Sequence, residues 1–356
     1  MLHYQTPPHP LCRLLWPVSL VYQQVIDRRN QHYNRQPPEQ VKLPIPVISV
    51  GNLTTGGTGK TPVTIALAQR FCQQGLKVVV LSRGYGAKTP QTYAVATHPN
   101  FGDEPYLIQQ HVPQATVIVG PNRSQNALRA MSDYRPDVVL LDDGFQHRKL
   151  ARDVDILLVD RDRGFGNGWL LPAGPLREPV RELWRATQVW VTHCSPGGIP
   201  VALLQQLHQN QAAEIQAIPF TLQGVRPFQA ATLNQAPTHS ANKTEALLPA
   251  HILRDKHIVA ISGIAYPQRF EQLLAQSGLS IQQQFRFPDH HNYRASEVHA
   301  LVQGHDPNKT VWITTEKDRT KLERLLPQSL LSSFYTTQLE PVLPQPLFPA
   351  FGGSFR

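Results

Sequence analysis

Cysteine is scarce in this sequence, and the few cysteines form no pattern. Cys12, Cys72 and Cys194 are odd in number and far apart, and no CxxC or Cys/His metal spacing is present. A disulfide framework or a structural zinc site would need such spacing, so neither is expected. Unpaired cysteines are typical of a reducing compartment.

Long hydrophobic runs are also missing. Near the N-terminus, LLWPVSLVYQQVI (Leu14 to Ile26) has no charged residue, but a helix that spans a bilayer needs roughly 20 apolar residues. The segment has no basic start followed by a small-residue cleavage site, which argues against a signal peptide. It is therefore expected neither to cross a membrane nor to direct secretion.

The same segment has the periodicity of a helix. Seven apolar residues recur at intervals typical of one helix face. They are Leu11, Leu14, Leu15, Val18, Tyr22, Val25 and Ile26. Pro17 is best accommodated near the first turn. Since Arg13, Arg28 and Arg29 flank the segment, one interpretation is an interfacial helix on an anionic membrane surface. The alternative is a helix that packs on the protein's own core.

Charged residues make up only 17% of the chain, but basic ones predominate, with 34 Lys and Arg against 25 Asp and Glu. A net charge of +9 favours an anionic partner, which is nucleic acid, an anionic membrane or a phosphorylated substrate. No basic run interleaved with aromatic residues is evident, so nucleic acid is not expected. The 356 residues, 41% of them hydrophobic, suffice for two domains.

Apolar β-rich runs alternate with helical stretches in the first two thirds of the chain. Six such runs are Ile45 to Val50, Lys77 to Ser82, Ala115 to Gly120, Asp137 to Asp142, Asp153 to Asp160 and Gln188 to His193. A helix is expected from about Thr61 to Gln74, where Gly75 ends it. Near-continuous Val, Ile and Leu runs separated by helices predict a doubly wound α/β domain with a mostly parallel sheet.

The pattern weakens after this domain and then resumes. Further strands are expected at His257 to Ser262, at IQQQFRF and at TVWITT, with a helix from about Pro267 to Gln276. This predicts a second, smaller α/β domain. The predicted boundaries are a membrane-surface helix at 1–30, a nucleotide-binding domain at 31–222, a linker at 223–255, the smaller domain at 256–340 and an irregular tail at 341–356.

The strongest chemical signal is SVGNLTTGGTGKTP (Ser49 to Pro62), a strand that leads through a glycine-rich loop into a helix. Backbone N–H groups of such a loop bind phosphate, Lys60 reaches the β- and γ-phosphates, and the Thr61 hydroxyl binds Mg²⁺. The usual GxxxxGK[ST] pattern has glycine where this chain has Thr54. The predicted nucleotide-binding residues are Thr54, Thr55, Gly56, Gly57, Thr58, Gly59, Lys60 and Thr61.

A second apolar strand ends in two carboxylates. DVVLLDDGFQH places Asp142 and Asp143 at its C-terminal end, where a carboxylate can hold Mg²⁺ directly or through water. Gln146 and His147 follow in the same turn. Which of the two aspartates contacts the metal is left open.

Four loops add candidate polar groups. SRGYG carries Arg83, FGDEP carries Asp103, and LPAGPLREP carries Arg177, whose guanidinium suits phosphate or transition-state charge. In the second domain FPDHHNY places two histidines after a strand, and TTEKD follows another strand. Ligands of open α/β sheets bind beyond the C-terminal ends of the strands, although each of these loops by itself is also compatible with ordinary capping.

In this order, GNLTTGGTGKTP, SRGYG, GDEP, DDGFQH, LPAGPLREP, FPDHHNY and TTEKD resemble the tetraacyldisaccharide 4'-kinase family, from about residue 10 to residue 325. The glycine-rich loop alone is generic, whereas the ordered set of seven is specific. The resemblance implies a P-loop kinase of two α/β domains with ATP and Mg²⁺ as cofactors. It implies an acylated glucosamine disaccharide 1-phosphate as acceptor, and attachment to the cytoplasmic face of the inner membrane through the N-terminal helix.

The resemblance also assigns roles to single residues. Lys60 and Thr61 match the nucleotide and metal positions, and Asp142 and Asp143 match the acidic pair. Asp103 matches the proposed base, with His290 rather than His291 as its partner, and Arg177 matches an arginine of the site. The predicted substrate-binding residues are Asn52, Arg83, Gln146 and His147.

One alternative function class uses a similar loop. Membrane-associated ATPase switches of the partitioning or metal-carrier type carry GGTGKT-like sequences, normally with a lysine before the two glycines, where this chain has Thr55. Dimerisation on addition of ATP is expected for the switch and not for the kinase. The sequence implies no particular oligomeric state.

Overall fold

The computed structural model describes residues 9–35, 40–84, 93–194, 198–228, 247–289, 291–345 and 347–348. The chain divides into two units, unit 1 with residues 1–220 and 341–356 and unit 2 with residues 221–340. In the described part of the chain, unit 1 contains an eight-stranded sheet in the order β3-β4-β2-β5-β1-β6-β7-β8. Neighbouring strands of this sheet pair in parallel, except that β3 is antiparallel to β4. This confirms the predicted doubly wound, mostly parallel domain.

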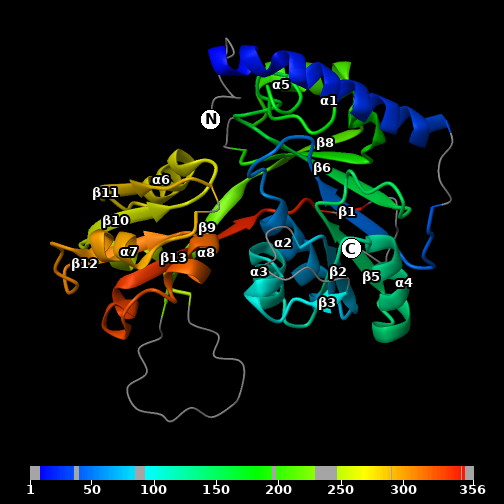
Figure 1. Cartoon of the computed structure of the whole chain (residues 1–356). Coiled ribbons are helices and arrows are strands. Elements are labelled where there is room, and N and C mark those ends of the chain that lie inside the picture. Colours follow the sequence, from blue (N-terminus) through cyan, green and yellow to red (C-terminus); the bar gives the residue numbers. More distant parts are fainter. Residues whose placement is uncertain are drawn as a thin grey trace. The chain divides into compact units, whose positions relative to one another are not determined.

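Six strands and the helix after the glycine-rich loop lie close to their predicted ranges, whereas two further strands of unit 1 were not predicted. Its strands are β1 (Val47–Gly51), β2 (Val78–Ser82), β3 (Ala94–Val95), β4 (Thr116–Val119), β5 (Val138–Asp142), β6 (Val154–Asp160), β7 (Gln188–Thr192) and β8 (Glu214–Ile218). Its helices are α1 (Pro10–Arg35), α2 (Lys60–Gln73), α3 (Asp103–His111), α4 (Arg123–Tyr134) and α5 (Val201–Gln209), with 3₁₀ turns η2 (Pro99–Phe101) and η3 (Val180–Arg185). Figure 1 shows α2 and α3 together on one side of the sheet and α4 on the other.

Both faces of this sheet are covered, which explains the uninterrupted apolar runs. In β2, Val78 and Val80 share a core with Phe71 of α2, whereas Leu81 shares the opposite core with Ala127 of α4. Successive side chains of a strand point to opposite faces, so a strand between two helical layers needs an apolar residue at every position.

Unit 2 is a smaller α/β unit, as predicted. Its described part holds a five-stranded sheet in the order β11-β10-β12-β13-β9. The strands are β9 (Phe220–Pro227), β10 (His257–Ser262), β11 (Ile281–Arg286), β12 (Thr310–Thr314) and β13 (Phe334–Pro341). The helices are α6 (Pro267–Gln276), α7 (Ala295–Val302) and α8 (Glu316–Leu322), with 3₁₀ turns η4 (Ala250–Leu253) and η5 (Gln328–Ser333).

Two segments differ from the predicted boundaries. The predicted linker at 223–255 begins inside β9, which adds a strand to the second sheet. The predicted tail at 341–356 belongs to unit 1, where Leu347 and Phe348 are buried in the core beside Phe71. These two residues therefore pack in the core of unit 1, although in the sequence they follow unit 2.

Helix α1 also differs from its prediction. It runs from Pro10 to Arg35, and Pro17 lies inside it rather than in its first turn. The residues expected on one face are divided, because Ile26 is buried with Cys12 and Ser19 while the other face is exposed. Among the described residues no helix is both long and apolar enough to cross a membrane. The buried face packs on the protein's own core, whereas a membrane contact of the exposed face stays a prediction.

Candidate active site

The glycine-rich loop connects β1 to α2 at the C-terminal edge of the sheet, in the middle of unit 1. Gly56 and Gly59 have φ angles of 96° and 85°, which glycine adopts without strain. Two hydrogen bonds hold Thr58 of the loop in place. Its Oγ1 accepts one from Asn52 Nδ2 at 2.9 Å, and its backbone oxygen accepts one from Thr192 Oγ1 at 2.9 Å. Lys60 opens α2, whose first N–H groups lack partners within the helix and favour a bound anion.

The start of the loop is tied to the LPAGPLREP segment. Thr54 forms a β-bridge with Leu176, and the Thr55 amide donates to Pro175 O at 2.7 Å. The Arg177 amide donates to Leu53 O at 2.7 Å. This pairing brings Arg177, which is distant in sequence, to the phosphate-binding loop.

Asn52 is the polar centre beneath Lys60. Its Oδ1 accepts hydrogen bonds from Lys60 Nζ at 3.2 Å and from Arg177 Nη2, and its backbone oxygen accepts one from Gln146 Nε2 at 3.0 Å. The structure thus joins Asn52, Lys60, Gln146 and Arg177, and it gives Asn52 and Gln146 contacts that position the cationic groups.

Asp143 is the counter-ion of both cations. Arg177 donates to its two carboxylate oxygens at 2.9 Å each, and Lys60 Nζ lies 3.7 Å from Oδ1. Burial opposes ionisation of Asp143, but Lys60 and Arg177 outweigh it and hold the pKa well below its usual range. Asp143 has a φ of 53°, a left-handed conformation that aspartate tolerates better than most residues. Asp143 is therefore ionised and forms ion pairs with both Lys60 and Arg177.

Asp142 is in a different state although it is the neighbouring residue. It is buried at the end of β5, where one carboxylate oxygen, Oδ2, accepts a hydrogen bond from Ser82 Oγ at 3.2 Å. The other oxygen, Oδ1, is buried without a hydrogen-bond partner in the described part of the chain. Burial, followed by the charges of Glu104 and Asp143, raises the pKa of Asp142 to about 7.

The unpaired oxygen of Asp142 is what a hard divalent cation requires. Mg²⁺ is usually bound by one or two carboxylates together with substrate phosphates, and Thr61, whose hydroxyl is the other predicted ligand, is buried at the start of α2. No group of three or more His, Cys, Asp or Glu side chains in the described residues is arranged for a metal. The residues present therefore fit a metal shared with a nucleotide rather than a site made by protein alone.

Arg123 and His147 border the acidic pair on the side of α4. Arg123 Nη1 donates to the backbone oxygens of Asp142 and Asp143 at 3.0 and 2.9 Å. His147 Nε2 lies 3.0 Å from Ser124 Oγ, and burial, with the Arg123 charge next, lowers the pKa of His147 to about 4. His147 is accordingly neutral at physiological pH.

Arg83 and Asp103 are near this centre, whereas His290 lies outside the described residues. Arg83 is exposed just beyond β2. The pKa of Arg123 is lowered mainly by burial, and the positive charge of Arg83 lowers it further. Asp103 is the first residue of α3 and follows Gly102. Its partnership with His290 stays a prediction.

The described neighbours of His290 belong to unit 2. His291 Nε2 lies 3.1 Å from Glu297 Oε2, and its ring stacks on Phe287 at 4.8 Å. The Tyr293 hydroxyl donates to Asp318 Oδ1 at 3.0 Å. The FPDHHNY and TTEKD motifs are therefore joined by a buried tyrosine–aspartate hydrogen bond.

Three residues of the site were not predicted from the sequence. Ser82 and Glu104 act on Asp142, and Arg123 holds the backbone of both aspartates. Ser82 and Glu104 stand inside motifs that were already noticed, SRGYG and GDEP. Arg123 lies just after a strand, at the start of a helix capped by Asn122. This position at the C-terminal edge of the sheet is the signal that could have indicated it as a site residue.

Comparison with known proteins places these features in one family. The model of the family described as tetraacyldisaccharide-1-P 4'-kinase matches residues 11–351. A tetraacyldisaccharide 4'-kinase of Pelobacter propionicus is 37% identical over 329 residues, which are 89% of this chain and 84% of the relative. The corresponding protein of Syntrophus aciditrophicus is 35% identical over 352 residues, 95% of this chain and 91% of the relative.

A solved structure agrees with these matches. The crystal structure of LpxK from Aquifex aeolicus in complex with ATP has a TM-score of 0.71 and 28% sequence identity to this chain, and the match covers 94% of this chain and 96% of that one.

Proposed function

Because the chain belongs to the tetraacyldisaccharide-1-P 4'-kinase family, we propose that it transfers the γ-phosphate of ATP to the 4'-hydroxyl of an acylated glucosamine disaccharide 1-phosphate, a step of lipid A biosynthesis. The observation that carries this function is the convergence of Lys60, Asp142, Asp143 and Arg177 on the glycine-rich loop. The family match over residues 11–351 favours this kinase over a membrane-associated ATPase switch.

The phosphates of ATP are held by the loop and its cations. The amides from Gly56 to Thr61 and the side chain of Lys60 surround the β- and γ-phosphates. Before the nucleotide binds, Asp143 neutralises Lys60 and Arg177. A triphosphate competes with Asp143 for these two cations, so Arg177 becomes free to neutralise charge on the transferred group.

Asp142 and the Thr61 hydroxyl would hold Mg²⁺, which would supply charge neutralisation for phosphoryl transfer. The support is Oδ1 of Asp142, which is buried and has no hydrogen-bond partner among the described residues. Asp142 must be ionised for this role, and the approach of a cation favours its ionised form.

Asp103 accepts the proton of the attacking hydroxyl. Asp103 begins α3, and the charge of its neighbour Glu104 acts on Asp142, so this end of α3 lies close to the metal-binding carboxylate. A positioned general base contributes about 10²- to 10⁴-fold to the rate, which sets the size of the effect expected when Asp103 is replaced.

The test is transfer of radiolabelled phosphate from ATP to the lipid disaccharide in detergent micelles. We expect labelled lipid with the wild-type chain and none with Lys60→Ala. Asp103→Asn should lower kcat about 100-fold or more while ATP affinity changes little. Asp133→Asn, which changes a carboxylate on the surface of α4, is the matched control. Equal losses of turnover and ATP binding in Asp103→Asn would contradict its role as base.

The exposed face of α1 is proposed to lie on the anionic surface of the membrane, at the cytoplasmic face of the bacterial inner membrane. Among the described residues, 14 large hydrophobic side chains are exposed, and 8 of them are on this one helix. They are Leu11, Leu14, Leu15, Trp16, Val18, Leu20, Val21 and Val25. Such a concentration of apolar surface on one element marks an interaction site, and the exposed Arg13 and Arg28, which flank it, suit anionic lipid.

Vesicle sedimentation tests the membrane contact. Leu14→Asn and Val21→Asn, at positions 75% and 63% exposed, should reduce binding to vesicles that contain anionic lipid, without disturbing the buried face of α1. Leu128→Asn, at an exposed position on α4, is the matched control and should sediment like the wild type. Unchanged sedimentation of both α1 variants would contradict the contact.

A further inference from the structure

The buried face of α1 is polar as well as apolar, and its polar atoms contact one segment. Ser19 Oγ donates to Leu170 O and accepts from the Ala173 amide, both at 2.9 Å. One turn later, the Tyr22 hydroxyl donates to Arg177 O at 3.1 Å. The helix thus holds the backbone of the segment that delivers Arg177 to the site.

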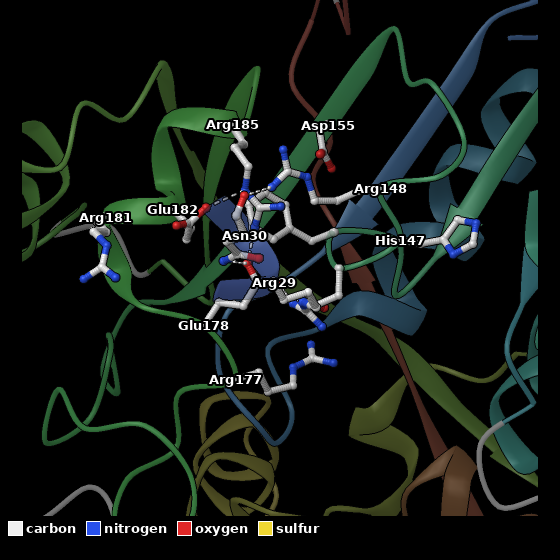
Figure 2. Close-up of polar contacts among 12 residues, drawn as sticks. Arg29, Asn30, His147, Arg148, Asp155, Arg177, Glu178, Arg181, Glu182 and Arg185 are labelled. Atoms are coloured by element: carbon white, nitrogen blue, oxygen red, sulfur yellow. Dashed lines mark hydrogen bonds and ion pairs between the residues drawn. The ribbon is translucent and has the colours of Figure 1, made fainter. Parts of the chain in front are cut away.

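Glu178, the next residue, is anchored still more strongly. Its side chain is fully buried, and it accepts hydrogen bonds from Arg29 Nη2 at 2.7 Å, from Asn30 Nδ2 at 3.4 Å and from Arg185 Nη2. Figure 2 shows Glu178 beside α1 with Arg177 next to it. A buried carboxylate needs such partners to remain in place, so α1 supplies part of what fixes the backbone at position 178.

The opposite edge of the same segment contacts the nucleotide-binding loop. Leu176 pairs with Thr54, and the Arg177 amide donates to Leu53 O at 2.7 Å. The Arg177 side chain donates hydrogen bonds to Asp143 and Asn52. The segment is therefore a bridge from α1 to the phosphate-binding centre.

We propose that α1 positions Arg177 for phosphoryl transfer, with Tyr22 and Arg29 as the positioning residues that act through the Arg177 backbone and Glu178. One helix then has two separate functions, because its exposed apolar face meets the membrane while its buried polar face holds the catalytic arginine. This inference rests on the proposed kinase function for its kinetic consequence, although the contacts themselves do not depend on it.

The kinetic effect follows from geometry. A displacement of about 1 Å in a group that contacts the reacting atoms costs about 100-fold in rate. Tyr22→Phe removes one hydrogen bond and keeps the ring, so partial loosening should lower kcat about tenfold with little change in KM for ATP. Arg29→Met should do the same, and Arg29→Lys, which keeps the charge opposite Glu178, should recover part of the loss.

A double-mutant cycle separates positioning from a general loss of stability. If Tyr22 acts through Arg177, Tyr22→Phe should have little further effect on kcat in an Arg177→Lys background. Gln24→Ala, at an exposed position on the same helix, is the matched control and should match the wild type. Additive losses of Tyr22→Phe and Arg177→Lys, or an unchanged kcat in Tyr22→Phe, would overturn the proposal.

Hydrogen exchange gives an answer that needs no lipid and no turnover. Peptides that cover residues 170–178 should exchange faster in Tyr22→Phe and Arg29→Met than in the wild type, whereas Gln24→Ala should leave them unchanged. If the wild-type chain failed to label the lipid, the proposed function would be wrong, and exchange would still decide the coupling of α1 to Arg177. Equal exchange in all variants would overturn that coupling.

Discussion

Asp142→Asn should make the protein more stable and, at the same time, unable to bind Mg·ATP tightly. The substitution keeps the shape of the side chain and removes its charge. In the folded protein burial, assisted by Glu104 and Asp143, moves the pKa of Asp142 from 3.8 to about 7. Since one pKa unit corresponds to about 1.4 kcal/mol, ionising this carboxylate in the fold costs on the order of 4 kcal/mol.

The pH dependence gives the sign of the effect. Between pH 4 and pH 7 the Asp142 carboxyl retains in the folded protein a proton that it has released in the unfolded chain, so the contribution of Asp142 to stability falls as pH rises through this window. The advantage of Asp142→Asn should therefore grow over the same window and become constant above it. From pH 5 to pH 8 the difference in free energy of unfolding should increase by about 2.5 kcal/mol.

Calorimetric unfolding without nucleotide, at pH 5 and pH 8, measures this difference. For a domain of this size each kcal/mol corresponds to about 2–4 °C in Tm. Asp143→Asn is the contrasting variant, because it removes the counter-ion of Arg177 and should lower Tm. A Tm of Asp142→Asn below that of the wild type at pH 8, or a difference that does not change with pH, would refute the reasoning.

Three further predictions concern the same centre. The affinity for Mg·ATP should rise as pH increases through about 7, because the metal needs Asp142 ionised. Titration calorimetry in buffers of different ionisation enthalpy should detect the proton that Asp142 releases on binding. An affinity that does not depend on pH would contradict this prediction. Gly144→Ala should lower stability by about 1–3 kcal/mol, since the new Cβ would lie 2.4 Å from Ser49 Oγ; Gly57→Ala, with nothing within 4 Å, is the control in thermal unfolding. The ring of His147 should remain neutral from pH 5.5 to 8, because its pKa is lowered to about 4, and NMR signals that titrate near pH 6.5 would be inconsistent with its buried position.

The sequence left β3, β8, β9 and β13 unpredicted, but it was sufficient for the other nine strands and for the glycine-rich loop. These features depend on local properties, which are strands apolar at every position and glycines where the backbone needs a positive φ. The N-terminal helix was also expected, but the division of its apolar residues was not, because periodicity cannot say which of two faces finds a partner. Ser19, for example, is buried where its hydroxyl bonds the backbone of Leu170 and Ala173, which are 151 and 154 residues away in the sequence.

The ionisation of the acidic pair was beyond sequence reasoning. Asp142 and Asp143 are identical residues at adjacent positions. Within the described part of the chain, however, one oxygen of Asp142 is buried without a partner, whereas Asp143 pairs with Lys60 and Arg177. Burial and partners that come from β2, α2 and a loop 34 residues away decide the pKa of each, and none of these distances can be read from local pattern.

By itself the sequence determined the fold class, the glycine-rich loop and the family, because local residue types and the order of the motifs encode all three. Only the tertiary structure decided that Asp143 holds Arg177, that Asp142 has a buried oxygen without a partner among the described residues, and that α1 connects through Glu178 to the segment that carries Arg177. The physical reason is that ionisation and side-chain position depend on burial and on partners distant in sequence, which exist only once the chain has folded.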